Sequence, residues 1–365
     1  MGSTISAIGI ATPANRFSQK EILNFMIEAH SLEETGASRL KKLYDVSGID
    51  FRHSVINDFG LQRGNYSFFG NNDNLDPFPS TEKRGTLFEI SAKVIAIKAI
   101  EDLLKEISLN KNDITHLITV SCTGMYAPGL DIDIIDHLNL SKTIERTCIN
   151  FMGCYGAFNA LKTADYICRA DNYAKVLIVD VELCTLHFQR ENTLENWVSN
   201  SLFADGAAAV LIESENYRSS SKGFRLKTFF NTLVTEAKDE MAWRIGDTGF
   251  QMHLSSHIAK NIGKKIKDVT ASLVEKSGLN RSSIKHLAIH PGGRRILEVC
   301  EDLLELPEEA LQHSYNVLKE YGNMSSVTIL FVLQKLLKET KEGEKTMSFA
   351  FGPGLTFESM ILETV

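Results

Sequence analysis

Short apolar segments alternate with longer segments of helical periodicity along most of the chain. The short segments are rich in β-branched residues and predict buried strands, whereas the longer ones repeat apolar residues every three or four positions and predict helices. The predicted strands cover residues 5–10, 116–121, 146–151, 175–181, 207–212, 224–230, 286–290, 346–351 and 356–362. The predicted helices cover residues 19–30, 87–107, 157–170, 257–277, 294–304 and 325–340. This alternation is typical of an α/β fold.

The two halves of the chain share a short motif. Residues 113–120 and 283–290 each predict a strand that carries a His-Leu dipeptide. At nearly equal separations after these strands come Cys154 and Asn323, and each follows a Gly-containing turn that opens a helix. A match this short can arise by chance, but it favours a duplicated unit. Two similar units would place Cys154 and Asn323 at equivalent helix starts.

A polar, Ser-rich segment at 218–223 falls where a connector between two halves would lie. We therefore expect an N-terminal half over residues 1–217 and a C-terminal half over residues 224–365. Within the N-terminal half, residues 57–84 contain clustered Asn and Pro and predict an irregular excursion from the repeating pattern.

Composition excludes several function classes. The chain has 365 residues, is 43% hydrophobic and 23% charged, and carries a net charge of −7. It lacks the positive field and the basic blocks that nucleic-acid binding requires, so we expect no DNA or RNA partner. No apolar run approaches the roughly 20 residues of a membrane span, and the N-terminus lacks the features of a signal peptide. The expected location is the cytoplasm.

The six cysteines form no metal or disulfide signature. None lies in a CxxC pair, and none belongs to the spacings of common zinc sites. They are too sparse in a chain of this length for a disulfide scaffold. We therefore expect no metal site and ask whether one cysteine is a nucleophile.

Cys154 stands apart because it lies between a predicted strand and the start of a predicted helix. A thiol at a helix N-terminus faces unpaired backbone N–H groups, which can lower a cysteine pKa from about 8.5 into the range of about 3.5 to 7.5. The pattern thus favours a reactive thiolate. The alternative is a buried cysteine that only packs.

Two other residues could act with this thiol. His290 ends an apolar strand and is followed by Pro291, so its imidazole would be displayed at a strand end, where α/β sheets bind ligands. Asn323 precedes an apolar helix, and its amide could donate to a developing oxyanion. Each also has a structural alternative: a satisfied buried histidine, and a helix N-cap.

Four ordered motifs carry a resemblance to a known family. They are Gly-Cys-Tyr-Gly at 153–156, Ile-His-Pro-Gly-Gly at 289–293, Tyr-Gly-Asn-Met-Ser-Ser at 321–326 and Phe-Gly-Pro-Gly-Leu-Thr at 351–356. In this order they resemble the type III polyketide synthases, the chalcone synthase family, in its bacterial form. The resemblance implies the thiolase fold, a duplicated α/β unit in five layers ordered αβαβα. It also implies a homodimer and no metal or redox cofactor.

The resemblance also implies roles for residues. Cys154 would be the nucleophile and acyl anchor, with His290 and Asn323 completing the catalytic triad. Phe203 and, with a less certain register, Phe250 match the family's two gatekeeper phenylalanines. Further positions that match the substrate cavity are Ala127, Cys184, His187, Ser325 and Gly354.

A departure from the family concerns the binding of CoA. Arg39 and Lys42 match cationic positions at the CoA phosphates, but Val46 replaces a lysine of that cluster. One charge contact to phosphate is lost. CoA would then depend on other cations, or an acyl carrier protein would deliver the acyl group.

The implied activity is that of an acyltransferase that condenses an acyl-CoA starter with malonyl-CoA. Ala127 replaces a methionine of plant members and suggests additional room, and no polar cluster suits an aromatic starter. We therefore expect a medium or long fatty acyl starter and an alkylpyrone or alkylresorcinol product. Synthesis of a tetrahydroxynaphthalene-type product from malonyl-CoA alone stays open.

Related enzymes of the same fold fit the sequence less well. The type III ketoacyl-acyl-carrier-protein synthases of fatty-acid initiation usually carry Gln-Ala-Asn after the histidine, where this chain has Pro291 and two glycines. A degradative thiolase needs a second cysteine near the C-terminus, and the last one here is Cys300. Hydroxymethylglutaryl-CoA synthase needs a catalytic glutamate, for which Glu182 is available. A catalytically silent subunit would have lost the triad.

Overall fold

The computed structural model describes residues 2–255 and 257–365. The strands are β1 (Ser3–Ala11), β2 (Asn15–Ser18), β3 (Phe51–Ser54), β4 (His116–Ser121), β5 (Glu145–Asn150), β6 (Lys175–Leu183), β7 (Asp205–Ser214), β8 (Phe224–Leu233), β9 (Met241–Gly246), β10 (Gly249–Leu254), β11 (Ile284–Ile289), β12 (Lys345–Gly352) and β13 (Thr356–Thr364). The helices are α1 (Gln19–Ala29), α2 (Glu34–Asp45), α3 (Thr81–Glu106), α4 (Leu130–Leu138), α5 (Gly156–Ala170), α6 (Leu194–Leu202), α7 (Ile258–Ser277), α8 (Arg294–Leu304), α9 (Gln312–Tyr321) and α10 (Val327–Glu339).

Two runs of strands with the same internal order make up the large sheet. Its order is β11-β12-β13-β8-β1-β7-β6-β4-β5. In the N-terminal run, β4 and β6 are parallel, while β6 with β7 and β7 with β1 are antiparallel. The C-terminal run repeats this pattern, since β11 and β12 are parallel and β12 with β13 and β13 with β8 are antiparallel. The runs meet where β1 pairs with β8 over two residue pairs.

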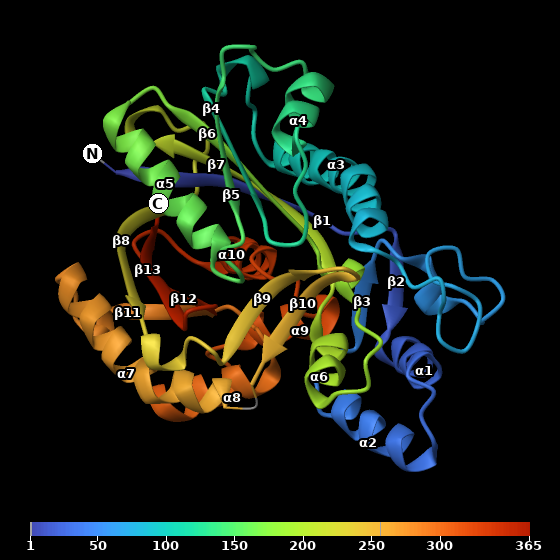
Figure 1. Ribbon diagram of the computed structural model, residues 1–365. Coiled ribbons are helices and arrows are strands. Elements are labelled where there is room, and N and C mark those ends of the chain that lie inside the picture. Colours follow the sequence, from blue (N-terminus) through green and yellow to red (C-terminus); the bar gives the residue numbers. More distant parts are fainter. Residues whose placement is uncertain (1, 256) are drawn as a thin grey trace.

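Two helices, α5 and α10, lie between the sheet halves (Figure 1). Every residue of α10 from Val327 to Gln334 is buried, as expected for a helix that contacts protein on all sides. Phe158 of α5 and Phe331 of α10 join one core with Ile178 of β6 and Met360 of β13. This central layer is therefore shared by both halves of the chain.

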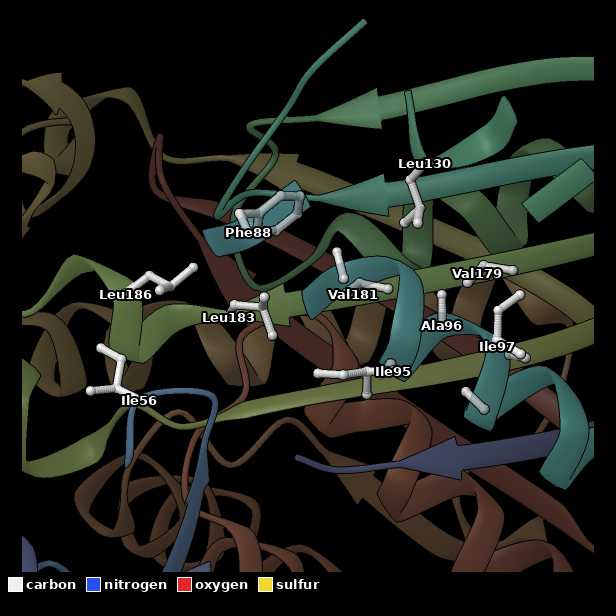
Figure 2. Close-up of a cluster of buried hydrophobic side chains, with 14 of the residues drawn as sticks. Ile56, Phe88, Ile95, Ala96, Ile97, Leu130, Val179, Val181, Leu183 and Leu186 are labelled. Atoms are coloured by element: carbon white, nitrogen blue, oxygen red, sulfur yellow. The ribbon is translucent and has the colours of Figure 1, made fainter. Parts of the chain in front are cut away.

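Further helices cover the two outer faces of the sheet halves. On one side, α3 and α4 pack over the N-terminal run, and on the opposite side α7 and α8 pack over the C-terminal run (Figure 1). Figure 2 shows Ile95 of α3 near Val181 of β6 in the first of these outer cores. Because side chains alternate along a strand, β6 sends Val179 outward and Ile178 to the central layer. The fold is the predicted duplicated α/β unit in the layer order αβαβα.

The predicted elements form with shifts of a few residues at their ends, except that α3 starts six residues earlier than predicted, at Thr81. Residues 57–80 hold only a short 3-10 turn, in agreement with the predicted irregular excursion. The sequence patterns missed the helices α2, α4, α6 and α9, the short strands β2 and β3, and the β9–β10 hairpin. Three of these helices are short, since α4 and α6 have nine residues each and α9 has ten, and α2 buries only Leu40 and Tyr44.

The described residues give no sign of a membrane span or a metal cluster. No helix within residues 2–255 and 257–365 combines the length and apolar character needed to cross a bilayer. In the same ranges, no group of three or more His, Cys, Asp and Glu side chains is arranged to hold a metal ion.

The central layer predicts a large difference between two substitutions on α5. Phe158 is fully buried between the sheet halves, whereas Tyr166 is 59% exposed. Phe158→Ala should lower the free energy of unfolding by about 3 to 5 kcal/mol, and Tyr166→Ala should change it by no more than about 0.5 kcal/mol. Urea denaturation followed by circular dichroism measures both. Equal losses would show that the central layer is not the tightly packed core described here.

Candidate functional site

A single cavity of about 730 Å³ contains all three residues of the predicted triad. Cys154, His290 and Asn323 line it together with Phe203. Its walls come from α2, α6, the β9–β10 hairpin and the start of α8, so both halves of the chain contribute. The predicted nucleophile and its two partners are thus brought together from three separate segments.

A tight approach of two loops positions Cys154. The residue follows β5 and lies two residues before the first turn of α5. Gly153 adopts a φ of +78°, and a Cβ at this position would lie 2.4 Å from Cδ of Pro353. Only glycine fits this contact without displacing one of the loops. The motifs around Cys154 and around Pro353 therefore depend on each other sterically.

Burial of Cys154 opposes the thiolate that its place at a helix start predicts. Burial raises the pKa of Cys154 to about 12, and the nearby Ser325 side chain opposes this shift only in part. The carboxyl group of Glu182 raises it further. Cys154 is only 7% exposed, and removal from water disfavours the charged form of its thiol. Burial therefore favours the neutral thiol at Cys154.

His290 is also neutral in the resting site. Its backbone N–H donates to the carbonyl of Phe349 at 2.8 Å, which fixes it at the end of β11. Burial lowers the pKa of the imidazole to about 3. Neither ring nitrogen has a hydrogen-bond partner among the described residues. The ring is therefore free to accept a proton at one nitrogen and to donate from the other.

Asn323 is held by its own side chain and is not the N-cap of the following helix. Its Oδ1 accepts from the backbone N–H of Ser325 at 2.9 Å, and its Nδ2 donates to the carbonyl of Gly292 at 3.0 Å. Helix α10 starts only at Val327, with Ser326 at the cap position. These two bonds fix the orientation of the amide. Within the described chain, one amide N–H is left for a ligand in the cavity.

Phe203 is attached to Asn323 through the backbone. Ala204 N–H donates to the carbonyl of Asn323 at 2.8 Å, and Asn323 N–H donates to the carbonyl of Leu202 at 2.9 Å. The buried guanidinium of Arg52 donates to the carbonyl of Phe203 at 2.8 Å and packs on Gly322. The predicted gatekeeper therefore has a fixed backbone beside the triad.

Phe250 stacks on His187 and does not line the large cavity. The two rings lie 4.2 Å apart at an interplanar angle of 6°. Phe250 N–H donates to His187 Nδ1 at 2.9 Å, so Nε2 carries the proton and donates to the carbonyl of Thr123 at 2.7 Å. Burial lowers the pKa of His187 to about 3, which keeps the ring neutral. His187 thus fixes the hairpin that carries Phe250.

Two small inner cavities lie beyond the triad. The first, of about 20 Å³, is lined by Cys154, Cys184 and Ser325, and the second, of about 30 Å³, by Cys184 and His187. Trp243 lines both, and its indole N–H donates to the carbonyl of Cys122 at 2.7 Å. The space behind the nucleophile is therefore largely filled.

Sequence reasoning missed the residues that fill this space. Trp243 and Met252 come from the β9–β10 hairpin, and Met252 lines the large cavity and both inner ones, as Phe203 does. The only available signal was the pair of short alternating segments around the Asp247-Thr248 turn. The family resemblance implied no role for Trp243 or Met252 on this hairpin.

Eight predicted site residues do not line the cavity that holds the triad. Besides Phe250 and the inner-cavity residues Cys184, His187 and Ser325, they are Ala127, Gly354, Arg39 and Lys42. Ala127 lines a separate hollow of about 280 Å³ beside the edge strand β5. Gly354 lies in the turn between β12 and β13 with a φ of +131°. Arg39 and Lys42 are exposed on α2, of which only Leu43 lines the cavity, together with Val46 and Ser47 directly after the helix.

Two cations that the sequence did not single out do line the large cavity. Arg294 and Arg295 follow the Pro-Gly-Gly turn at the start of α8. Both are ion-paired with Glu298, at 2.9 Å and 3.2 Å, and both are more than half exposed. These pairs are weak in water, so the guanidinium groups can exchange Glu298 for another anion.

Comparisons with known proteins identify the family. A family model for chalcone and stilbene synthases, N-terminal domain, matches residues 2–216, and one for the C-terminal domain matches residues 225–365. The chain is 28% identical over 372 residues to the alpha-pyrone synthesis polyketide synthase-like Pks18 of Mycobacterium tuberculosis, covering 100% of this chain and 91% of that protein. It is also 28% identical over 368 residues to the probable polyketide synthase 1 of Dictyostelium discoideum, but spans only 11% of that longer protein.

Solved structures give the same result. The C-terminal type III polyketide synthase domain of Steely1, a type I/III hybrid from Dictyostelium, superimposes with a TM-score of 0.92 at 27% identity, covering 100% of both chains. PKS-I from the brown alga Ectocarpus siliculosus superimposes with a TM-score of 0.92 at 29% identity, covering 100% of this chain and 98% of that one. The resemblance carried by the four motifs is confirmed. The chain belongs to the chalcone and stilbene synthase family and is a type III polyketide synthase.

Proposed function

We propose that the protein loads an acyl group from acyl-CoA onto Cys154, extends it with units from malonyl-CoA and cyclises the product. The observation that supports this most directly is the convergence of a thiol, a neutral imidazole and an unpaired amide N–H on one cavity. No metal or redox cofactor takes part in the proposed reaction. The electrophile of this reaction is a thioester, and the nucleophilic carbon forms when malonyl-CoA loses CO₂.

In the loading step, His290 takes the proton of the Cys154 thiol as the sulfur attacks the thioester carbonyl. The bond from Cys154 sulfur to the acyl carbon forms, the bond to CoA sulfur breaks, and the departing CoA thiolate takes the proton from His290. Both groups are neutral at rest, so charge develops only during attack. A buried site favours this sequence over a permanent ion pair because both ions would lack water.

In the extension step, malonyl-CoA loses CO₂, and the electron pair of the broken bond becomes an enolate of the CoA thioester. The free amide N–H of Asn323 and a ring N–H of His290 donate to the enolate oxygen. The enolate carbon then attacks the acyl carbonyl on Cys154, and the cysteine sulfur leaves. Repeated rounds precede ring closure.

A fatty acyl starter and an alkylpyrone or alkylresorcinol product fit the apolar surroundings of the nucleophile. Phe203, Met241 and Met252 line the cavity next to Cys154. Because the first inner cavity holds only about 20 Å³, a longer chain requires movement of the side chains that close it. We assign that closure to Trp243. The relative named for alpha-pyrone synthesis supports the pyrone product.

Arg294 and Arg295 replace Arg39 and Lys42 as our preferred contacts for the CoA phosphates, because they line the cavity. An acyl carrier protein is the alternative acyl donor.

We also propose a homodimer through β5, which is an edge strand with largely exposed residues. The free thiol state of the six cysteines agrees with a reducing compartment such as the cytoplasm.

Mass spectrometry of products distinguishes this proposal from its alternatives. The enzyme is incubated with malonyl-CoA and a panel of acyl-CoAs of increasing length. Pyrones or resorcinols that contain the starter support the proposal. A single condensation that depends on acyl carrier protein would favour the fatty-acid initiation reaction, and products formed from malonyl-CoA alone would favour the tetrahydroxynaphthalene-type reaction.

Removal of the nucleophile should abolish product formation. Cys154→Ala is expected to lower the rate of condensation by at least about a thousandfold, because no other group can hold the acyl chain as a thioester. Cys300→Ala is the matched control, since that thiol is buried on α8 and does not line the cavity. Retention of condensation by Cys154→Ala would exclude the proposed mechanism.

The neutral resting thiol makes a prediction about pH. Only the thiolate reacts with iodoacetamide, and the pKa of Cys154 is raised to about 12. Alkylation of Cys154 should therefore accelerate roughly tenfold for each pH unit between about pH 7 and pH 9. Peptide mass spectrometry separates this site from the exposed Cys148. A rate that is constant across this range would instead indicate a thiolate–imidazolium pair.

The role of Trp243 in chain length can be tested by enlarging the site. Trp243→Ala removes a large side chain that lines both inner cavities, so kcat/KM for the longest accepted starter should rise at least about tenfold relative to the shortest. Met26→Ala is the control, because Met26 lines only the far inner cavity. An unchanged starter range in Trp243→Ala would exclude this role.

A further inference from the structure

Strand β6 carries two carboxyl groups toward the central helix layer. Val176 and Ile178 point into the central core, and the alternation of side chains brings Asp180 and Glu182 to the same face. Both carboxyl groups are 0% exposed. The hydroxyl of Ser326, directly before α10, lies 2.9 Å from each of them. No residue in this arrangement belongs to the triad.

Glu182 receives hydrogen bonds whose direction is fixed. Cys122 N–H donates to its Oε2 at 3.0 Å. The Thr123 hydroxyl lies 2.7 Å from the same oxygen, and it already accepts from the backbone N–H of Leu183 at 2.8 Å. The hydrogen of Thr123 is therefore left for Glu182. Two donors on one carboxyl group favour its ionised form.

Asp180 has no such donors. Its Oδ1 contacts only Ser326, and its Oδ2 has no partner among the described residues. The Ser326 hydroxyl has a single hydrogen and cannot donate to both carboxyl groups. If both were ionised, one buried charge would face a lone pair of Ser326 without a donor, which is strongly unfavourable. The geometry requires one proton on the pair.

We propose that Asp180 carries this proton and donates it to Ser326, which in turn donates to Glu182, so that the pair holds one negative charge near the Cys154 thiol. In this series of hydrogen bonds from Asp180 through Ser326 to Glu182, each hydrogen then lies between one donor and one acceptor. In agreement, burial together with the neighbouring Glu182 raises the pKa of Asp180 well above its usual value. Burial also raises the pKa of Glu182, but the hydrogen bonds from Thr123 and Cys122 lower it.

The number of negative charges on Asp180 and Glu182 affects how readily the Cys154 thiol ionises. The titratable groups that face the pair are the thiols of Cys122, Cys154 and Cys184. A second carboxylate would disfavour the thiolate of Cys154 further and slow its attack on any electrophile. Asp180 is therefore a positioning residue. It orients Ser326 and keeps the local charge at −1 without contacting substrate.

Alkylation of Cys154 by iodoacetamide tests the proposal without requiring catalytic activity. Rates at one pH are compared for the wild type, Asp180→Asn and the double variant Asp180→Asn with Glu182→Gln, all in a Cys148→Ser background. The amide introduced by Asp180→Asn still donates to Ser326 and changes no charge, so the rate of this single variant should stay within about twofold. The double variant loses the single charge, so its rate should rise about tenfold or more.

An acceleration of about tenfold in Asp180→Asn alone would overturn the proposal, because it would show that Asp180 is ionised. If that variant does not fold, infrared spectroscopy of the wild type with isotope-labelled aspartate shows whether Asp180 is protonated. At about pH 8, Asp205, with its pKa raised to about 6, is ionised, so a remaining aspartic acid carbonyl band belongs to a group such as Asp180. Absence of this band would also overturn the proposal. A failure of the proposed polyketide activity would affect neither measurement.

Discussion

The close packing of α5 against α10 between the two sheet halves is the constraint on which the site depends. A Cβ on Gly156, the first residue of α5, would lie 3.0 Å from Val120 and 3.5 Å from Ser326. The helix starts are therefore held next to each other, and the loops that precede them deliver Cys154 and Asn323 to one cavity. Since each helix packs against strands of both halves, displacement of either would disturb the core and the site together.

Removal from water governs the chemistry of this site more than the helix starts do. The thiol of Cys154 and the imidazole of His290 are both shifted toward their neutral forms by burial. The same effect acts on the carboxyl groups of Asp180 and Glu182, where only a shared proton satisfies the bonds observed. Neutral resting groups allow charge to develop only when a substrate supplies new partners. Such a site limits side reactions with water.

Much of the fold and the triad was predictable from the sequence because the relevant signals are local. Strands such as β6 bury nearly all their residues, and helices such as α3 carry a long apolar stripe, so periodicity identified them. Helix α2 and the β9–β10 hairpin were not predicted because few of their side chains are buried. The residues that close the inner cavities, Trp243 and Met252, lie on that hairpin and were missed for the same reason.

The sequence by itself determined the fold class and the family, and it predicted Cys154, His290 and Asn323 as the triad, because steric demands such as that at Gly153 impose short motifs. Only the tertiary structure decided the burial of Cys154, the cations that line the cavity and the closure of the space behind Cys154. These properties depend on which distant side chains surround a group. Burial and contact between segments far apart in the chain, as between β6 and the hairpin or α10, are not encoded in any local spacing.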